Sequence, residues 1–560
     1  MSERNRDTRT SWQFHNATKY VVTGQAEGDA RILMGEPPNL GPAIGEQDPA
    51  IEPFPYKIYT SLEPIPLPRE PFVSPVRALD ALAMTGAPST GSGQAVSGGR
   101  AIPDLATIAQ LCLWSNGVLK RWRSPWGREI EFRAAGCTGA RYHLELYVVC
   151  GPLPGLDAGV YHYAAHDHSL RRLRAGDYRA LVVEATGNEP AVAQAPAIAV
   201  CTSTFWRNAW RYQERAYRHV YWDAGTLLAN VLAVAGSARL PARVVLGYAD
   251  AAIDALLDVD GEREAAVALV ALGRDGATEG SPTAGRLDLP TRAISAREID
   301  FPMIRAMHDA SSLDSGSDAS AWRAEPLRRT LPPPSGPITP LQPLDGAMIP
   351  DESIVDVIQR RRSNRHYAAE TPLPFAAFST VLERAMRGTA IDCLDPAAPS
   401  LHDAYLIVNN VEGLAPGTYL LDRDRREVEL LADGDQRADA ARLACTQDYA
   451  SDAHVNVYTL TDLAPVLVRY GNRGYRLAQL EAALFAGKLQ LAAHALGLGA
   501  VGSTSVDDEV TAFFSPHAAG KSFMFVAVFG QRRRATATET TASRRYLRPV
   551  PGQGEGEGSA

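Results

Sequence analysis

The sequence predicts an α+β fold that is built twice in tandem, and two observations carry this prediction. A block of arginines and tyrosines at 211–218 recurs at 469–476, and a glycine-containing block at 155–161 recurs at 413–419, each 258 residues further on. Matches at one shared offset indicate an internal duplication. Helical and strand-like periodicities also mix without a regular strand–helix–strand alternation, which is typical of the α+β class.

Each copy has the same order of elements. A first helix is followed by an alternating strand, a hairpin with glycine, a short helix, a second strand, a long apolar helix and a last strand. The expected ranges are 105–114, 142–149, 197–202, 220–235 and 265–273 in the first copy, and 375–386, 455–461, 477–496 and 523–530 in the second. Because a helix that is apolar all round is buried, we expect the two long helices to pack on one another between the copies.

Changes in composition divide the chain. Pro and aromatic residues crowd the N-terminal region, and residues 84–99 have the Gly/Ser composition of a flexible linker. We expect an extended N-terminal arm at 1–83, a first domain at 100–275, a Pro-rich linker at 276–349, a second domain at 350–548 and a disordered tail at 549–560.

The overall composition excludes several classes of protein. Hydrophobic residues make up 45% of the 560 residues and charged residues 21%, which describes a folded chain, and the net charge of −8 does not favour nucleic acid. The six cysteines are scattered without metal-ligand spacing, so we expect a reducing compartment and no metal site. No apolar run reaches the roughly 20 residues that cross a bilayer, and the start of the chain lacks a signal-peptide pattern. We therefore expect a cytoplasmic protein without a membrane partner.

One basic stretch stands out against this acidic background. Residues 360–365 contain four arginines and Ser363, directly after a helical pattern. Arginine meets phosphate oxygens in a planar, two-pronged way, and a hydroxyl adds a neutral donor. The alternatives are a solvated basic turn or a short nucleic-acid or targeting patch. Since the basic residues are local, they suit a small anion better than a polyanion.

These features together resemble a known family. The Arg-Arg-Ser-x-Arg run at 361–365, the long helix ending in Gly-Leu-Gly at 497–499 and the repeated blocks are similar to the FMN-dependent nitroreductase superfamily, and more narrowly to the SagB/ThcOx-type dehydrogenases, which include azoline oxidases. Members of the superfamily are homodimers whose flavin sites take phosphate-binding arginines from one subunit and a P-S-x-G-type turn from the other. The resemblance implies two fused nitroreductase-like domains that form an intrachain pseudo-dimer.

The two copies have kept different halves of such a site. The second copy has the arginine run, whereas its counterpart in the first copy falls near Thr90 within the Gly/Ser linker. The first copy has a version of the glycine turn at 136–145, whereas the second has residues 394–403 without the glycine. The resemblance therefore implies one composite site and one FMN per chain.

The resemblance also assigns residues to this site. Gly139 would let backbone lie against the isoalloxazine, and Gly502 would let backbone amides approach the phosphate. The cofactor-binding candidates are Arg361, Arg362, Ser363, Arg365, Gly502, Ser503, Arg544, Arg545, Cys137, Thr138 and Gly139.

The catalytic candidates are Arg211 and Tyr212, because peptide-oxidising relatives place a Lys-Tyr pair there that is implicated in proton transfer. An arginine stays protonated and is a poor base, and Tyr212 could instead pack a helix or line the substrate site. Cys137 has no recognisable base beside it and is better explained as a turn residue than as a nucleophile. His143 could face the site or form an ion pair within its strand.

The expected activity is hydride transfer between FMN and an organic substrate, either a small molecule or a peptide. In the azoline-oxidase branch, the reaction would be oxidation of a thiazoline or oxazoline in a peptide. Two alternatives stay open: an NAD(P)H-dependent nitro- or quinone-type reductase with the same flavin, and a non-catalytic scaffold whose degenerate halves hold no flavin.

Overall fold

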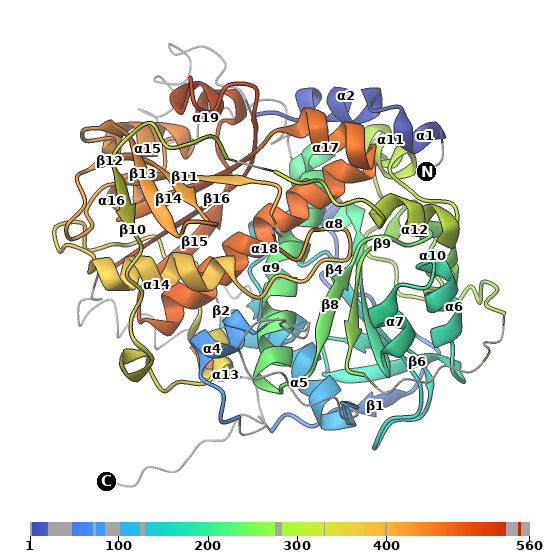
Figure 1. Cartoon of the computed structure of the whole chain (residues 1–560). Helices are drawn as coiled ribbons and strands as arrows, with labels where there is room; N and C mark the ends of the chain where they lie inside the picture. The colour runs from blue at the N-terminus through green and yellow to red at the C-terminus, as the bar shows by residue number, and fades with distance from the viewer. Residues whose placement is uncertain are drawn as a thin grey trace, which may run out of the picture.

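Two seven-stranded sheets organise the chain, one in each copy (Figure 1). The computed structural model describes residues 3–20, 47–70, 74–84, 101–123, 129–274, 280, 283–329, 331–397, 400–533 and 547–549. Within these ranges the α+β class and the tandem arrangement that the sequence predicts are confirmed.

Both sheets have the same strand order, and all neighbouring strands are antiparallel. The first sheet runs β1 (Pro64–Pro66), β6 (Ser169–Ala175), β5 (Gly159–Ala164), β4 (Leu144–Cys150), β7 (Ala197–Thr204), β9 (Glu264–Leu272) and β8 (Ala242–Val245). The second runs β10 (Ile338–Pro340), β13 (Glu427–Asp433), β12 (Gly417–Asp422), β11 (Asp403–Val408), β14 (Val455–Thr461), β16 (Ser522–Gly530) and β15 (Gly499–Ser503). The central strands are buried along their length because helices cover them.

The helices also correspond between the copies. Those of the first are α4 (Ala78–Ala83), α5 (Leu105–Asn116), α6 (Arg179–Ala185), α7 (Pro190–Gln194), α8 (Phe205–Tyr212), α9 (Ala216–Ser237) and α10 (Asp250–Leu257). Their counterparts are α13 (Ile354–Arg360), α14 (Phe375–Met386), α15 (Arg437–Leu443), α16 (Tyr449–Asp452), α17 (Leu463–Tyr470), α18 (Arg473–Ala495) and α19 (Asp507–Phe513).

Further elements lie outside this repeat. They are the helices α1 (Glu3–Arg6), α2 (Arg9–Ala17), α11 (Pro302–Ala310) and α12 (Gly316–Arg323), the short 3-10 helices η2 (Pro49–Ile51), η3 (Thr138–Ala140), η4 (Gln213–Arg215) and η5 (Gly346–Met348), and a small sheet of β17 (Leu547–Pro549), β2 (Val118–Arg123) and β3 (Glu129–Arg133).

The long helices α9 and α18 cross at the centre of the molecule, as the sequence predicts (Figure 1). Glycines let them come close: a Cβ added to Gly225 would lie 2.6 Å from the carbonyl oxygen of Leu480. Near this crossing, the indole Nε1 of Trp222 donates a hydrogen bond of 2.6 Å to Gln479 Oε1. The two copies therefore share one continuous core.

The repeated block at 211–218 forms part of this interface. Arg215 Nη1 of the first copy lies 3.0 Å from Asp507 Oδ2 of the second, and Arg218 pairs with the other oxygen of the same carboxylate. Burial opposes ionisation of Asp507, but the two guanidiniums outweigh it and lower its pKa to about 2. A carboxylate at the start of α19 thus pairs with two buried arginines from across the interface.

The second block repeats the arrangement in the opposite direction. Arg473 and Arg476 of the second copy reach Asp250 of the first, with N–O distances of 2.6 and 2.7 Å. Burial again opposes ionisation, and again the arginines prevail and lower the pKa of Asp250 to about 2. The reciprocal pairs are the contacts of a pseudo-twofold dimer within one chain.

The structure corrects the predicted domain boundaries. The expected extended arm contains the helices α1, α2 and α4, and the expected linker at 276–349 contains α11 and α12. The strands β1 and β10 form corresponding edges of the two sheets, so each copy begins earlier than predicted. Short helices among many prolines have too few apolar positions to show a clear periodicity. In α4, for example, only Leu79 and Leu82 are large and buried.

The predicted tail begins at 549, where Pro549 still belongs to β17, and the rest of it lies outside the described residues. Among the helices that the structure describes, none combines the length and the apolar run needed to cross a bilayer.

Candidate functional site

The glycine turn of the first copy has an unusual backbone. Gly139 has a φ of 61°, and Ala140 and Tyr142 have φ values of 52° and 44°. Residues other than glycine rarely adopt this left-handed region, and each such residue costs about 1–3 kcal/mol when held there. The turn must therefore be held in place by its surroundings.

Asp223 of α9 provides that support. Its carboxylate accepts hydrogen bonds from Thr138 N at 3.0 Å and Thr138 Oγ1 at 2.8 Å, and the Cys137 thiol lies 3.1 Å from it. His143 Nε2 lies 2.8 Å from the same carboxylate. His143, which was expected either to face the site or to be an ion-paired strand residue, thus contacts the carboxylate that holds the turn.

The Cys137, His143 and Asp223 side chains also form a cluster with ligand atoms within 4.8 Å of one another, which no sequence spacing indicated. In the structure, the donors of the turn surround the carboxylate. Burial raises the pKa of the Cys137 thiol well above its usual value, and Asp223 raises it further. A thiol that holds its proton is a poor nucleophile, in agreement with a role in the turn.

Tyr212 lies directly against this turn. A Cβ added to Gly139 would come within 2.5 Å of Tyr212 Oη, so only glycine fits there. Burial raises the pKa of Tyr212 to about 12, and its ring meets His219 edge-on at 4.7 Å. Arg211 stands beside it, with its guanidinium carbon 5.6 Å from the Tyr212 ring centre. The structure thus brings the two catalytic candidates to the predicted turn.

Arg361 of the second copy reaches the same turn from the other side. It follows α13, and its Nε and Nη2 donate to the Ala134 carbonyl oxygen at 3.3 and 3.1 Å. Its Nη1 lies 3.7 Å from the position of a Cβ on Gly136. Burial lowers the pKa of Arg361. The arginine run and the glycine turn, 220 residues apart in sequence, therefore meet.

Lys120 of β2 belongs to this group and was not predicted. Its Nζ donates to the Arg361 carbonyl oxygen at 3.5 Å. Burial lowers the pKa of Lys120 to about 8, with further contributions from Arg362 and Arg361. Among the described residues, no acidic side chain forms an ion pair with any of these three cations. The cluster is therefore short of negative charge.

The rest of the arginine run follows β15. Asn364 N donates to the Ala500 carbonyl oxygen at 3.0 Å, and Ser363 forms a parallel bridge with the same residue. Arg365 lies 5.5 Å from the ring centre of Tyr449, whose hydroxyl donates to Ser503 Oγ at 2.6 Å. The predicted residues Ser363, Arg365 and Ser503 are thus gathered along one edge of the second sheet.

Gly502 and Arg362 are the remaining predicted residues of the second copy that the structure describes. Gly502 is on β15, but a Cβ there would lie 2.8 Å from the Phe525 ring, so packing inside the second copy explains the glycine. Arg362 has an exposed side chain. Arg544 and Arg545 lie outside the described residues; β17, which follows them, pairs with β2 so that Pro549 is opposite Lys120.

The residues present suit a phosphate-bearing flavin. Arg361, Arg365, Ser363 and Lys120 offer donors for a phosphate without competing carboxylates, and charged donors form the strongest hydrogen bonds to phosphate. The turn at Gly139 presents backbone together with the Tyr212 hydroxyl. Arg211 Nε is buried and has no hydrogen-bond partner among the described residues. A buried donor without an acceptor is a further indication that the site binds a polar ligand.

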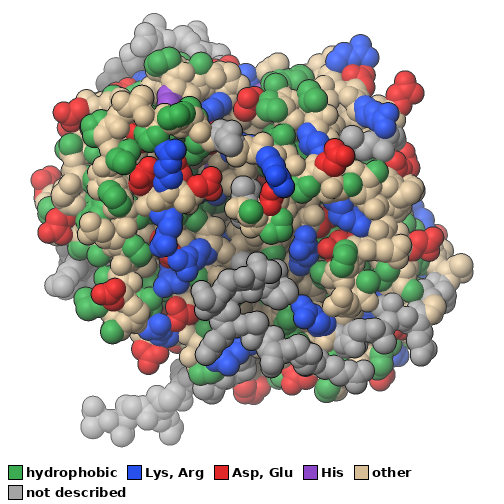
Figure 2. Space-filling model, in the orientation of Figure 1, with side chains coloured by type: hydrophobic (Ala, Val, Ile, Leu, Met, Phe, Trp, Pro, Cys, Tyr) green, Lys and Arg blue, Asp and Glu red, His purple; other side chains and the backbone are tan. Residues whose placement is uncertain are grey.

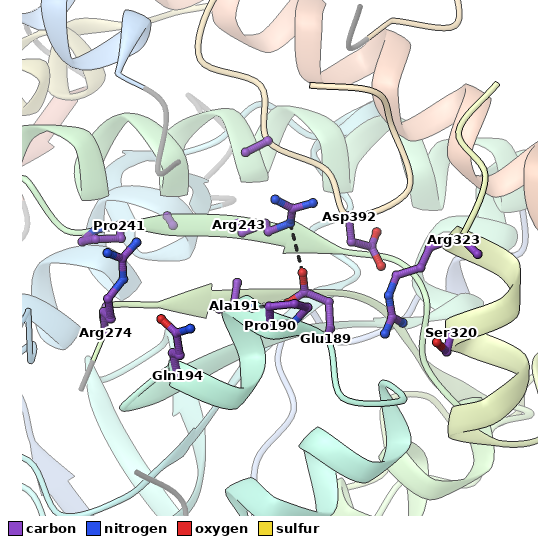
Figure 3. Close-up of a pocket in the computed structure, with 15 residues that line it drawn as sticks. Glu189, Pro190, Ala191, Gln194, Pro241, Arg243, Arg274, Ser320, Arg323 and Asp392 are labelled. Atoms are coloured by element: carbon purple, nitrogen blue, oxygen red, sulfur yellow. Dashed lines mark hydrogen bonds and ion pairs between the residues drawn. The ribbon is translucent and has the colours of Figure 1, made fainter. Parts of the chain in front are cut away.

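A separate cavity of about 470 Å³ lies at the free edge of the first sheet (Figure 3). Several of its charged groups are already partnered: Arg243 Nε lies 3.2 Å from Glu189 Oε1, and Asp392 accepts hydrogen bonds from two backbone amides of the first copy, each at 3.0 Å. None of the predicted site residues lines it. We therefore do not place the predicted chemistry there.

Comparison with known proteins agrees with this geometry. The nitroreductase family profile matches residues 135–274 and 358–527, which together make up more than half of the chain. The chain belongs to the nitroreductase family. The two matched regions coincide with the two structural copies, so this is a tandem member of the family.

Individual relatives cover parts of the chain. A protein named as a nitroreductase from Methanocaldococcus jannaschii is 27% identical over 146 residues, which are 26% of this chain and 72% of the relative. The trifolitoxin-processing protein TfxB of Rhizobium leguminosarum bv. trifolii is 29% identical over 147 residues, 25% of this chain and 39% of TfxB. A solved structure of a nitroreductase-type protein from Anabaena variabilis covers 94% of this chain and 99% of its own, with a TM-score of 0.69 and 23% identity, and so shares the fold.

The arginine run could be identified from the sequence, but three other residues of the site could not. Asp223 carried a weak signal, since it is an acid within an apolar helix. Lys120 and Tyr449 carried none, because only the folding of distant segments brings them to the site.

Proposed function

We propose that this protein is an FMN-dependent oxidoreductase with one composite flavin site per chain. The observation that carries the proposal is that Arg361, from the second copy, donates to the Ala134 carbonyl oxygen beside the glycine turn of the first copy and lies next to Gly136, where that turn begins. Arg361, Arg365, Ser363 and Lys120 would hold the phosphate, and the turn at Gly139 would adjoin the ring system.

Bound FMN would supply hydride transfer to or from an organic substrate. The chain itself supplies position and protons. Asp223, on the buried helix α9, fixes the turn. The Tyr212 hydroxyl, with its pKa raised to about 12, keeps its proton near neutral pH and so acts as a donor rather than as a base. Arg211 beside it stays charged and is suited to holding an anionic group of the substrate.

For the substrate, we propose a peptide, with oxidation of a thiazoline or oxazoline as the reaction. The similarity to TfxB, which is named for processing trifolitoxin, supports a peptide over 147 aligned residues. The arginines of the repeated block give no support for a peptide substrate, because four of them form ion pairs across the interface between the copies.

The flavin content of the purified protein tests the proposal. We expect one FMN per chain, and we expect Arg361→Ala to lose most of it, since a charge-assisted hydrogen bond contributes about 1.5–3 kcal/mol. Arg425→Ala is the matched control, because Arg425 is an exposed arginine of the same copy whose acidic neighbours lie on its own hairpin. A colourless protein that takes up no added FMN would support a non-catalytic scaffold instead.

The electron donor separates the two enzymatic possibilities. Family membership alone favours a reductase that uses NAD(P)H on nitro or quinone compounds. Bleaching of the bound flavin by NADH without peptide would support that reductase. Flavin that is bleached only by an azoline-containing peptide, and recovers with oxygen, would support the peptide oxidase.

A further inference from the structure

The second copy contains a residue equivalent to Asp223, but this residue does not hold a glycine turn. Glu481 of α18 lies 258 residues after Asp223 and lies 2.5 Å from His402 Nδ1, as Asp223 is bound by His143. In the first copy the carboxylate holds the glycine turn. Among the described residues of this region in the second copy, Leu401 N alone donates a backbone hydrogen bond to Glu481, at 3.3 Å. A side chain, rather than a glycine turn, occupies the space beside the Glu481 carboxylate.

Arg423, from the end of β12, occupies this place. Its guanidinium contacts His402 Nε2 and lies over the Phe485 ring, with 4.3 Å between the guanidinium carbon and the ring centre. Its nearest carboxylate oxygen, on Glu481, is 4.0 Å away. Arg423 Nε is buried and finds no hydrogen-bond partner in the described part of the chain. The guanidinium is thus only partly neutralised.

Lys488 adds a second cation with no partner. It lies two turns along α18 from Glu481, at the position equivalent to Asn230, whose amide donates to the Trp114 carbonyl oxygen at 2.8 Å. Lys488 is 1% exposed, and its Nζ has no hydrogen-bond partner among the described residues. Burial, with a smaller contribution from Arg423, lowers the pKa of Lys488 to about 7. A buried ammonium without a partner is costly, which points to a ligand that completes it.

A cavity of about 210 Å³ opens beside Arg423 and His402. The other arginines at its rim are already paired: Arg329 lies 2.5 Å from an oxygen of Asp403, and Arg426 lies 3.1 Å from one of Glu383. On the face shown in Figure 2, basic side chains with acidic neighbours gather over this part of the second copy, near α14. Glu383, Asp403 and Asp424 also line the cavity. Of the arginines that line it, Arg423 keeps a buried Nε without a hydrogen-bond partner among the described residues. Lys488 does not line the cavity, but it lies close enough to Arg423 for the two charges to interact.

We propose that this cavity is a second binding site, separate from the flavin site, which takes a compact oxyanion such as a carboxylate or a phosphate group. Arg423 would bind the anion in a two-pronged way, and Lys488, which does not line the cavity, would add positive charge behind Arg423. The volume suits a small acid or the acidic group of a larger molecule rather than a second flavin. The duplicated half that lost its glycine turn has thereby become a site of different specificity.

Thermal unfolding of the full chain with added anions tests this proposal. Inorganic phosphate and malonate are titrated separately against chloride at equal ionic strength, so that the two sources of oxyanion are distinguished. We expect at least one of them to raise the melting temperature saturably. Arg423→Gln should weaken the apparent affinity by about tenfold or more, as expected for a lost charge-assisted contact, and Lys488→Met, which removes a more distant charge, should weaken it to a smaller extent.

Three variants make the result specific. Arg426→Gln, at the rim, and Arg361→Ala, at the flavin site, should both retain the response, which separates this site from the proposed flavin site. Lys488→Met should also be more stable than the wild type in chloride alone, because it removes an unpaired buried charge. The proposal is overturned if neither anion stabilises the protein beyond chloride, or if Lys488→Met and Arg423→Gln bind as tightly as the wild type.

Discussion

The hydroxyl of Tyr212 occupies the space that a side chain at Gly139 would need, because a Cβ at Gly139 would lie 2.5 Å from Tyr212 Oη. The sequence suggested separate roles for these residues, one in catalysis and one in holding the cofactor. Their contact means that the position of the tyrosine and the shape of the turn depend on each other.

Gly139→Ala should therefore destabilise the protein, and Tyr212→Phe should relieve part of the loss. An alanine at a φ of 61° costs about 1–2 kcal/mol, and the contact with the hydroxyl adds to that. Without the hydroxyl, the nearest ring carbons lie at 3.1 and 3.2 Å. A double-mutant cycle of unfolding free energies measures this coupling. Equal losses from Gly139→Ala in both backgrounds would contradict it.

Asp507→Asn should weaken the joining of the two copies. It leaves Arg215 and Arg218 buried without their carboxylate, which costs about 3–5 kcal/mol in comparable cases. Asp508→Asn is the control, since the neighbouring Asp508 side chain is 66% exposed and its ion pair with Lys19 should contribute at most about 1 kcal/mol. Denaturant unfolding of both variants gives the comparison, and similar midpoints would rule out the proposed role.

Stability should fall in acid through Asp250 and Asp507. Both carboxyls have a pKa lowered from 3.8 to about 2, so their contribution is fully present above pH 3.8 and is lost as the pH falls toward 2. The lowering corresponds to about 2 kcal/mol for each group. Unfolding free energies measured between pH 5 and pH 2.5 should show this loss, and Asp507→Asn should show a shallower slope than the wild type.

Gly225→Ala tests the close crossing of α9 and α18. The added methyl group would meet backbone atoms of Leu480 and Leu484 at 2.6 Å, and overpacking of this kind costs about 1–3 kcal/mol. Gly346→Ala has open space around its Cβ and should leave stability nearly unchanged. Calorimetry of the two variants would settle the matter, and a neutral Gly225→Ala would show that the helices separate easily.

Lys120 should make flavin binding depend on pH. With its pKa near 8 in the absence of an anion, Lys120 loses its proton as the pH rises through that value, and the affinity for the FMN phosphate should fall. Fluorescence titration of FMN between pH 6.5 and pH 9 would record the fall. Lys120→Met should remove this step, whereas Lys19→Met, which affects a lysine paired with Asp508, should keep it.

Much of the fold could be predicted because its signals are periodic and repeated. The strand at 455–461 and the helix at 375–386 have the predicted bounds, and the long helices deviate by only a few residues at their ends. The meeting of the arginine run with the glycine turn was predicted through the unequal losses in the two copies.

What could not be predicted depends on contacts between distant segments. The arginines of the repeated block suggested a site, but their partners Asp250 and Asp507 lie on helices whose placement no local pattern reveals. Gly502 shows the same limit, because only the packed structure places the Phe525 ring in the space beside it.

The covalent link between the copies has a consequence for how they can change. In an assembly of identical subunits, every substitution appears twice, and its partners dissociate on dilution. Here each half can vary alone, and the effective concentration of one half around the other is set by the linking chain rather than by the amount of protein. One site can therefore acquire a new specificity, and the other can be lost, without a second gene. The two copies should also stay paired at any concentration of the protein in the cell.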